Sequence, residues 1–161
     1  MPDITESEKV KSNIQKWLLE EGFKIQSQPN DKTLFDFLAT DTKGIKTQVI
    51  QPTLKPDQVI IVIGLDIDEN QQSTLQAMEN KECLRFLWDL RFGLLNLGVG
   101  FSPISIPFKA LQISKTIYYD GLTKNAFMEK LFDVRTAFMF VLWTFDREFG
   151  ETKPKSDLMV R

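Results

Sequence analysis

Two aspartates stand two residues apart at the end of the most apolar stretch of the chain. The segment reads VIIVIGLDIDEN, and it places Asp66 and Asp68 directly after a run of β-branched residues. Carboxylate side chains can act as nucleophiles and can bind magnesium, so a pair of them at the end of a buried strand is a candidate site for chemistry. A metal-dependent phosphoryl hydrolase that uses Asp66 and Asp68 is therefore one hypothesis for this chain.

The motif resembles the nucleophile strand of haloacid-dehalogenase-type phosphatases, but the surrounding residues depart from that family. Asn70 stands where a threonine or valine is expected, and no Asp-Asp pair follows to complete the metal site. The simpler interpretation is that both aspartates close a strand and cap the positive N-terminal end of the next helix. We therefore predict no catalytic residue, no metal ion and no cofactor, and an enzyme is the less favoured class.

The residue types available to an enzyme are also restricted, because the chain has no histidine and a single cysteine. Histidine-dependent triads, histidine general bases and histidine-ligated metals are thereby excluded. Thiolate zinc sites are excluded as well. Cys83 falls on the apolar arc of a predicted helix, where a core position is favoured over a nucleophile.

Arg91 lies in the middle of the apolar side of the segment CLRFLWDLRFGLLNLG. A buried guanidinium without a partner is prohibitively costly, so we expect Arg91 to be paired. The candidate carboxylates are Asp36, Asp66, Asp68 and Asp133. A structural ion pair, or a buried stem whose charged head reaches solvent, is the favoured interpretation. An anion-binding site formed by Arg91, Asp66 and Asp68 is the alternative.

Hydrophobic periodicity and turn signals divide the chain into helices and strands. Helices are predicted from near the N-terminus to Gly22, from about Asn70 to a break at Glu79–Asn80, over 81–97, and from Thr123 to Phe149. Strands are predicted at 33–40, 45–51, 59–65, 99–105 and 111–119, with a weaker one at 23–28. The order α-βββ-α-ββ-α predicts an α+β domain, an antiparallel sheet with helices packed on it, over residues 1–150. Residues 151–161 are predicted to form a polar, mobile tail.

Two of the predicted helices have an apolar surface wider than the single stripe that packing on one neighbouring element requires. The apolar arc of residues 81–97 covers roughly 240° of a helical wheel, which predicts burial on two sides. The sheet would cover one side, and another helix or a second subunit the other. The last helix has a second stripe beside its core face, formed by Met128, Phe132, Met139 and Trp143. This second stripe is either more core or a partner-binding surface, since exposed methionines and aromatic residues suit adaptable binding.

Three segments together resemble a family of mainly archaeal proteins of unknown function: FLWDLRFGLLNLGVGF, VIQPTLKPDQVIIVIGLDI and ISKTIYYDGLTKNAFMEKL. The resemblance covers about residues 5–150 and implies no catalytic residue. The order of elements is also similar to the type III secretion chaperone-like fold. That similarity implies a small, acidic, cytoplasmic dimer that binds other proteins.

Charge and composition narrow the choice of partner. The net charge of −2 and the pI of about 5.3 give no attraction to nucleic acid or to acidic membranes. No apolar run approaches the roughly 20 residues that span a bilayer, and the N-terminal MPDITESEK lacks the apolar core of a secretory signal. We therefore predict a cytoplasmic protein-binding or chaperone-like module without catalytic activity, which pairs with a protein partner or with itself as a homodimer.

Overall fold

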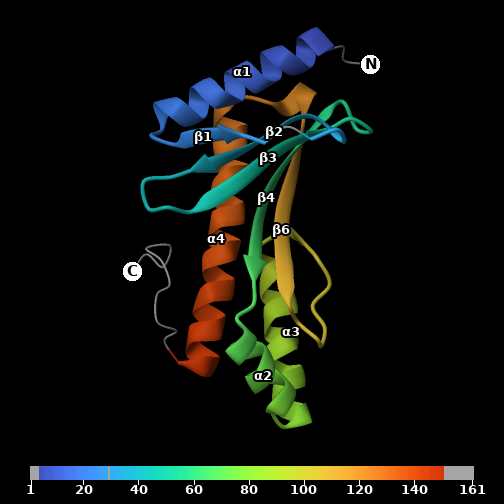
Figure 1. The fold of residues 1–161 in the computed structure, drawn as a ribbon, viewed down its shortest axis with the longest axis vertical. Coiled ribbons are helices and arrows are strands. Elements are labelled where there is room, and N and C mark those ends of the chain that lie inside the picture. Colours follow the sequence, from blue (N-terminus) through green and yellow to red (C-terminus); the bar gives the residue numbers. More distant parts are fainter. Residues whose placement is uncertain (1–3, 29, 151–161) are drawn as a thin grey trace. The chain divides into compact units, whose positions relative to one another are not determined.

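The fold is α+β, with helices packed on an antiparallel sheet, as the alternating blocks of the sequence predict. The computed structural model describes residues 4–28 and 30–150 (Figure 1). The helices are α1 (Ile4–Glu20), α2 (Glu69–Ala77), α3 (Asn80–Asn96) and α4 (Lys124–Phe149), with a short 3-10 turn at Tyr119–Gly121. The strands are β1 (Lys24–Ser27), β2 (Thr33–Thr40), β3 (Lys46–Pro52), β4 (Gln58–Asp66), β5 (Gly100–Phe101) and β6 (Ala110–Tyr118). The predicted tail 151–161 lies outside the described residues.

The strands are arranged in the order β1-β2-β3-β4-β6-β5. The first three pairings, from β1 to β4, are antiparallel, and so is the pairing of β5 with β6. The weak strand at 23–28 is present as β1, so four strands rather than three precede the central helical region. The predicted break at Glu79–Asn80 is confirmed, because α2 ends at Ala77 and α3 begins at Asn80.

The strand predicted at 99–105 is wrong in its length, since β5 contains only Gly100 and Phe101. Ser102 donates one more backbone hydrogen bond, to the carbonyl of Gln112. Pro103 follows and has no N–H to continue the ladder, which explains why pairing stops there.

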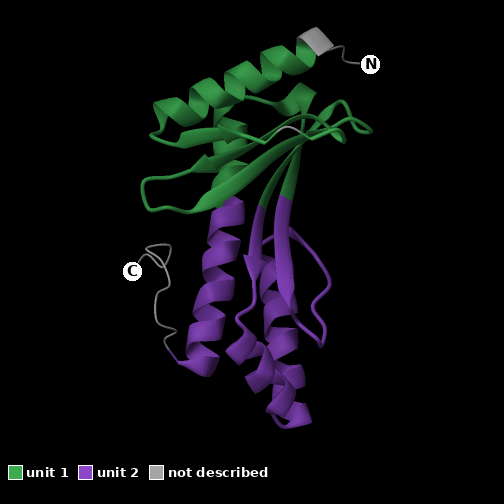
Figure 2. Cartoon of the chain, in the orientation of Figure 1, with its two compact units in different colours: residues 1–62, 115–132, 154–161 green, residues 63–114, 133–153 purple. Residues whose placement is uncertain are grey.

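The contacts of the chain group into two compact units, drawn in green and purple in Figure 2. In the described residues, the first unit comprises 4–62 and 115–132, and the second comprises 63–114 and 133–150. Strands β4 and β6 and helix α4 each contribute residues to both units. That residues 1–150 form a single domain stays a prediction.

In the first unit, α1 packs on β1 and β2 through residues spaced by one helical turn. Ile14 and Leu18 are fully buried, and the Trp17 ring lies 6.2 Å from the ring of Phe127. Gly22 ends the helix with a φ of 86°, which L side chains rarely adopt. The adjacent N–H of Phe23 donates to the Leu18 carbonyl and so closes the last turn.

In the second unit, α3 packs against the C-terminal part of α4 through aromatic rings. Phe86 lies 5.0 Å from Phe145 and 5.3 Å from Phe149, measured between ring centroids, and both pairs are edge-to-face. A Cβ atom added to Gly93 would come within 2.8 Å of three ring atoms of Phe140. Glycine at this position therefore allows the ring to lie directly on the α3 backbone.

No helix of the described residues is both long enough and apolar enough to cross a membrane.

Candidate functional site

One side of α3 carries a continuous row of large apolar side chains that the described part of the chain leaves exposed. The exposed fractions are 45% for Leu84, 49% for Trp88, 57% for Phe92 and 64% for Leu95. These residues recur every three or four positions, so they lie on one face of the helix. We call them the α3 stripe. Large apolar side chains gathered on one exposed face mark an interaction surface far more often than single ones do.

The opposite side of the same helix is core. Cys83, Phe86, Leu87, Leu90 and Leu94 are buried. The wide apolar arc of this helix predicts burial on two sides. Within the described residues, only one of the two sides is buried.

The centre of the α3 stripe is held in place by ring stacking and by Arg91. The rings of Trp88 and Phe92 stack at 5.4 Å between centroids, with an angle of 26° between their planes. The Arg91 guanidinium lies 4.6 Å from the centre of the Trp88 ring, a cation–π arrangement. Its Nη2 donates a hydrogen bond to the main-chain carbonyl of Ile104. Arg91 therefore ties the segment after β5 to α3 and positions the Trp88 ring.

The acceptor of Arg91 is thus a main-chain carbonyl, and the carboxylates considered from the sequence lie elsewhere. Asp66 is exposed at the end of β4. Asp68 is the N-cap of α2, and its carboxylate accepts from the N–H of Asn70 at 2.7 Å, which confirms the capping interpretation. Asp36 accepts from the side-chain amide of Gln48. None of these three carboxylates is among the contacts of Arg91 within the described residues.

Two further observations bear on the hydrolase hypothesis. In residues 4–28 and 30–150, no group of three or more histidine, cysteine, aspartate or glutamate side chains could hold a metal ion. One carboxylate oxygen of Asp68 also accepts the N-cap hydrogen bond, which is a structural role. An anion site at Arg91, Asp66 and Asp68 stays a prediction.

The second stripe of α4 is only partly accessible. Met128 is buried and Met139 is partly buried, whereas Phe132 is 46% and Trp143 61% exposed. The core interpretation therefore fits Met128, and a surface position fits Phe132 and Trp143. That these four residues bind a partner stays a prediction.

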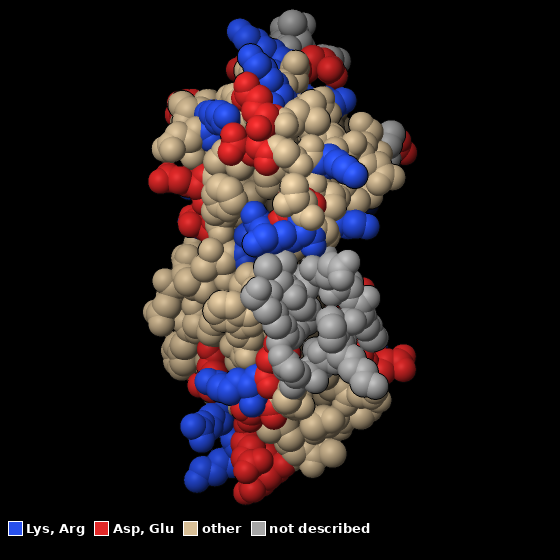
Figure 3. Space-filling model, turned by 90° about the vertical axis from the view of Figure 1, so that its left-hand side faces the viewer, with Lys and Arg blue, Asp and Glu red and all other residues tan. Residues whose placement is uncertain are grey.

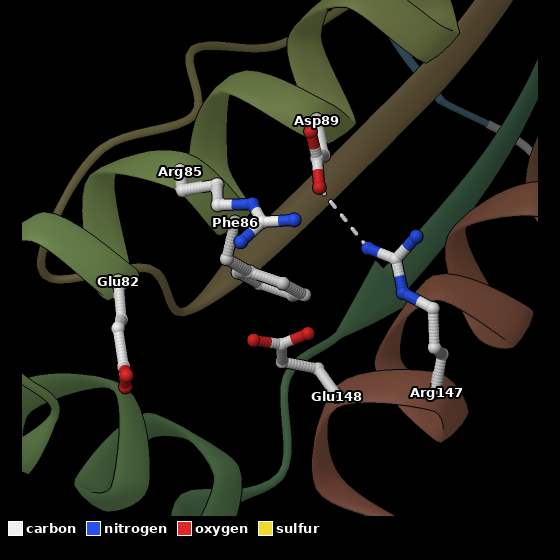
Figure 4. Close-up of a pocket in the computed structure, with 6 residues that line it drawn as sticks. All are labelled: Glu82, Arg85, Phe86, Asp89, Arg147 and Glu148. Atoms are coloured by element: carbon white, nitrogen blue, oxygen red, sulfur yellow. Dashed lines mark hydrogen bonds and ion pairs between the residues drawn. The ribbon is translucent and has the colours of Figure 1, made fainter.

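A hollow of about 350 Å³ lies between α3 and the end of α4 in the second unit (Figure 4). Its lining residues are Glu82, Arg85, Phe86, Asp89, Arg147 and Glu148. Arg147 Nη2 lies 3.1 Å from Asp89 Oδ2, and the two side chains are 61% and 44% exposed. Charges of both signs surround the Phe86 ring in Figure 4, so the hollow does not select for one sign of ligand. An exposed ion pair of this kind also contributes little to stability.

The face drawn in Figure 3 shows basic and acidic side chains interspersed, without a field of one sign. A continuous basic surface is what nucleic-acid binding requires. This face therefore lends no support to a nucleic-acid partner.

Sequence reasoning located the α3 stripe only indirectly. Periodicity marked Leu84, Trp88, Phe92 and Leu95 as apolar positions on an unusually wide arc, but it placed the partner surface on α4. The width of the arc was the usable signal. The side of the helix that the rest of the chain leaves uncovered could not be read from the residue types.

Comparison with known proteins gives a family and a similar structure. The model of the family described as "Uncharacterized conserved protein (DUF2299)" matches residues 10–145. A crystal structure of an uncharacterised protein from Methanothermobacter thermautotrophicus is similar, with a TM-score of 0.82 and 26% sequence identity. The similarity covers 88% of this chain and 99% of that chain. No curated protein matches the chain.

Proposed function

The chain belongs to this family of uncharacterised conserved proteins, and we propose that it is a cytoplasmic, non-catalytic protein-binding module that pairs with a second copy of itself through the α3 stripe. The observation that carries the proposal is the exposure of Leu84, Trp88, Phe92 and Leu95 on one helix face. Aromatic side chains at the centre of a surface are the usual anchors of protein interfaces. A secretion-chaperone-like architecture is part of the proposal and is supported by the order of the elements alone.

The spacing within the α3 stripe favours a second copy as the occupant. Leucines stand at both ends and the stacked aromatic pair stands in the middle. If two α3 helices cross antiparallel about a two-fold axis, Leu84 faces Leu95 of the other copy and Trp88 faces Phe92. The stripe is therefore close to self-complementary, as an isologous interface requires.

The length of the α3 stripe and the polar residues at its edges also suit the pairing of two helices. From Leu84 to Leu95 the stripe extends about 17 Å along the helix axis. Arg85 and Arg91 flank it with polar groups, which suits an apolar centre with a polar rim. Trp88 and Phe92 are about half exposed, so an interface would remove about half of the 150–250 Å² that full burial of an aromatic residue removes from water, or about 75–125 Å² each.

The test compares the mass in solution of the wild type with that of Trp88→Glu. Size-exclusion chromatography with light scattering should give the wild type twice the 18.6 kDa of one chain. Trp88→Glu should run as the single chain, because its carboxylate would be buried without a partner against the apolar Phe92 of the other copy.

Leu54→Glu is the matched control. Leu54 is 94% exposed and lies outside α3, so this variant should keep the mass of the wild type. Circular dichroism should show all three proteins folded. A wild type that is monomeric throughout a concentration series, or a Trp88→Glu variant that stays dimeric, would contradict the proposal.

A further inference from the structure

The sheet of the first unit has one buried face and one half-exposed face. Side chains alternate along each strand, and those that point toward the core, among them Phe37, Val49 and Ile61, are completely buried. Those on the other side are only partly covered: Leu38, Gln48, Ile50, Ile60 and Val62. We call this side the outer face. Figure 1 shows α1 running along the sheet, and α1 contacts β1 and β2.

A carboxylate stands among these apolar side chains. Asp36 of β2 pairs with Ile50 of β3, which pairs in turn with Ile60 of β4. In the adjacent row, Leu38 pairs with Gln48, and Gln48 with Val62. On this face Asp36 therefore lies among the aliphatic side chains of Leu38, Ile50 and Ile60 and the amide of Gln48.

Asp36 is 7% exposed, which is unusual for a carboxylate on a sheet face that the described residues cover only in part. Within those residues its oxygens accept from one donor group, since Gln48 Nε2 lies 3.0 Å from Oδ1 and 3.1 Å from Oδ2. Among the described residues, no lysine or arginine forms an ion pair with it. A buried carboxylate with one neutral donor group and no cation is costly to keep, and a cation that completes it would be bound strongly.

We propose that the outer face docks an amphipathic helix of another protein, with an arginine at the centre of that helix's apolar face to pair with Asp36. A helix is the element that covers the face of a sheet, because it buries an apolar stripe against apolar side chains. Arginine suits the site because its planar fork can donate to both carboxylate oxygens at once. The aliphatic side chains around Asp36 would exclude water from the pair. This surface is independent of the α3 stripe.

The probe is a pair of synthetic helical peptides with a leucine face, one with arginine and one with glutamine at its centre. Each is titrated into the ¹⁵N-labelled full chain and followed by NMR. The arginine peptide should perturb the amides of Gln48, Ile50 and Val62, and should bind about tenfold or more tightly than the glutamine peptide. Asp36→Asn keeps an acceptor for Gln48 and should abolish this preference. Equal affinities, perturbation confined to α3, no binding, or an Asp36→Asn variant that retains the preference would each overturn the proposal.

A second measurement separates docking from a structural role. If the charge of Asp36 serves a partner, Asp36→Asn should leave the melting temperature of the isolated chain unchanged or raise it. A fall of more than about 5 °C would show that the carboxylate stabilises the fold itself, and would overturn the inference.

Discussion

Phe86→Ala is expected to lower the free energy of unfolding by about 3–5 kcal/mol. Phe86 is 1% exposed, and its ring contacts the rings of both Phe145 and Phe149. Removing it leaves a cavity between α3 and α4 and abolishes two edge-to-face contacts, because the neighbouring rings cannot refill the space completely. Urea denaturation, with the midpoint and slope fitted together, measures the change.

Phe92→Ala is the matched control, since it removes the same side chain from the same helix on the exposed side. Phe92→Ala should lower the free energy of unfolding by less than about 1 kcal/mol, because little apolar contact within the chain is lost. Both substitutions are made in the Trp88→Glu background so that association does not contribute to the measured stability. Equal losses at the two positions would show that α3 is buried on both sides by its own chain.

Arg91→Ala is expected to lower the free energy of unfolding by about 1.5–3 kcal/mol, the usual range for a hydrogen bond to a charged group. The loss has two sources. The carbonyl of Ile104, a residue that is 3% exposed, loses its guanidinium donor, and the Trp88 ring loses the cation on its face. Because Arg91 ties residues 102–109 to α3, amide hydrogen exchange in that segment should also become faster.

Arg85→Ala supplies the comparison for that experiment. Arg85 lies on the same helix and is exposed, so its removal should change stability by no more than about 0.5 kcal/mol. If the two variants were equally stable, or if exchange in residues 102–109 were unchanged by Arg91→Ala, the tethering role of Arg91 would be wrong.

The fold was largely predictable because its signals are local. The ends of α1 and α4 follow from periodicity and from Gly22 and Gly150, which stand just beyond these helices, and the break at Glu79–Asn80 was predicted as well. The length of β5 was missed because a strand pattern continued past Pro103, whose missing N–H limits the ladder.

The partner of Arg91 could not be predicted for a different reason. Residue types reveal which carboxylates exist, and Asp36, Asp66, Asp68 and Asp133 were the natural candidates for an arginine in an apolar arc. Every residue has a main-chain carbonyl, so the sequence contains no signal that selects Ile104. Only the path of the chain after β5 brings that carbonyl to Arg91.

Which of the two apolar faces is exposed could be predicted only in part, because periodicity distinguishes apolar from polar positions and does not identify what packs against them. The apolar surfaces of α3 and α4 were similarly wide in sequence. In the structure Met128 is buried and Phe132 and Trp143 are exposed, while the whole α3 stripe is exposed. Which excess becomes surface depends on tertiary packing, including the close approach of Phe140 to Gly93, that residues far apart in the sequence determine together.

The measurement that tests the central claim most directly is site-specific cross-linking between two copies. In a Cys83→Ala background, Leu84→Cys and Leu95→Cys variants are prepared separately, one of them with a size tag, then mixed and oxidised. An antiparallel α3 pair places position 84 of one copy beside position 95 of the other, so the mixed disulfide should predominate over either homodisulfide. Absence of covalent dimer, or homodisulfides in place of the mixed product, would contradict self-association through the α3 stripe.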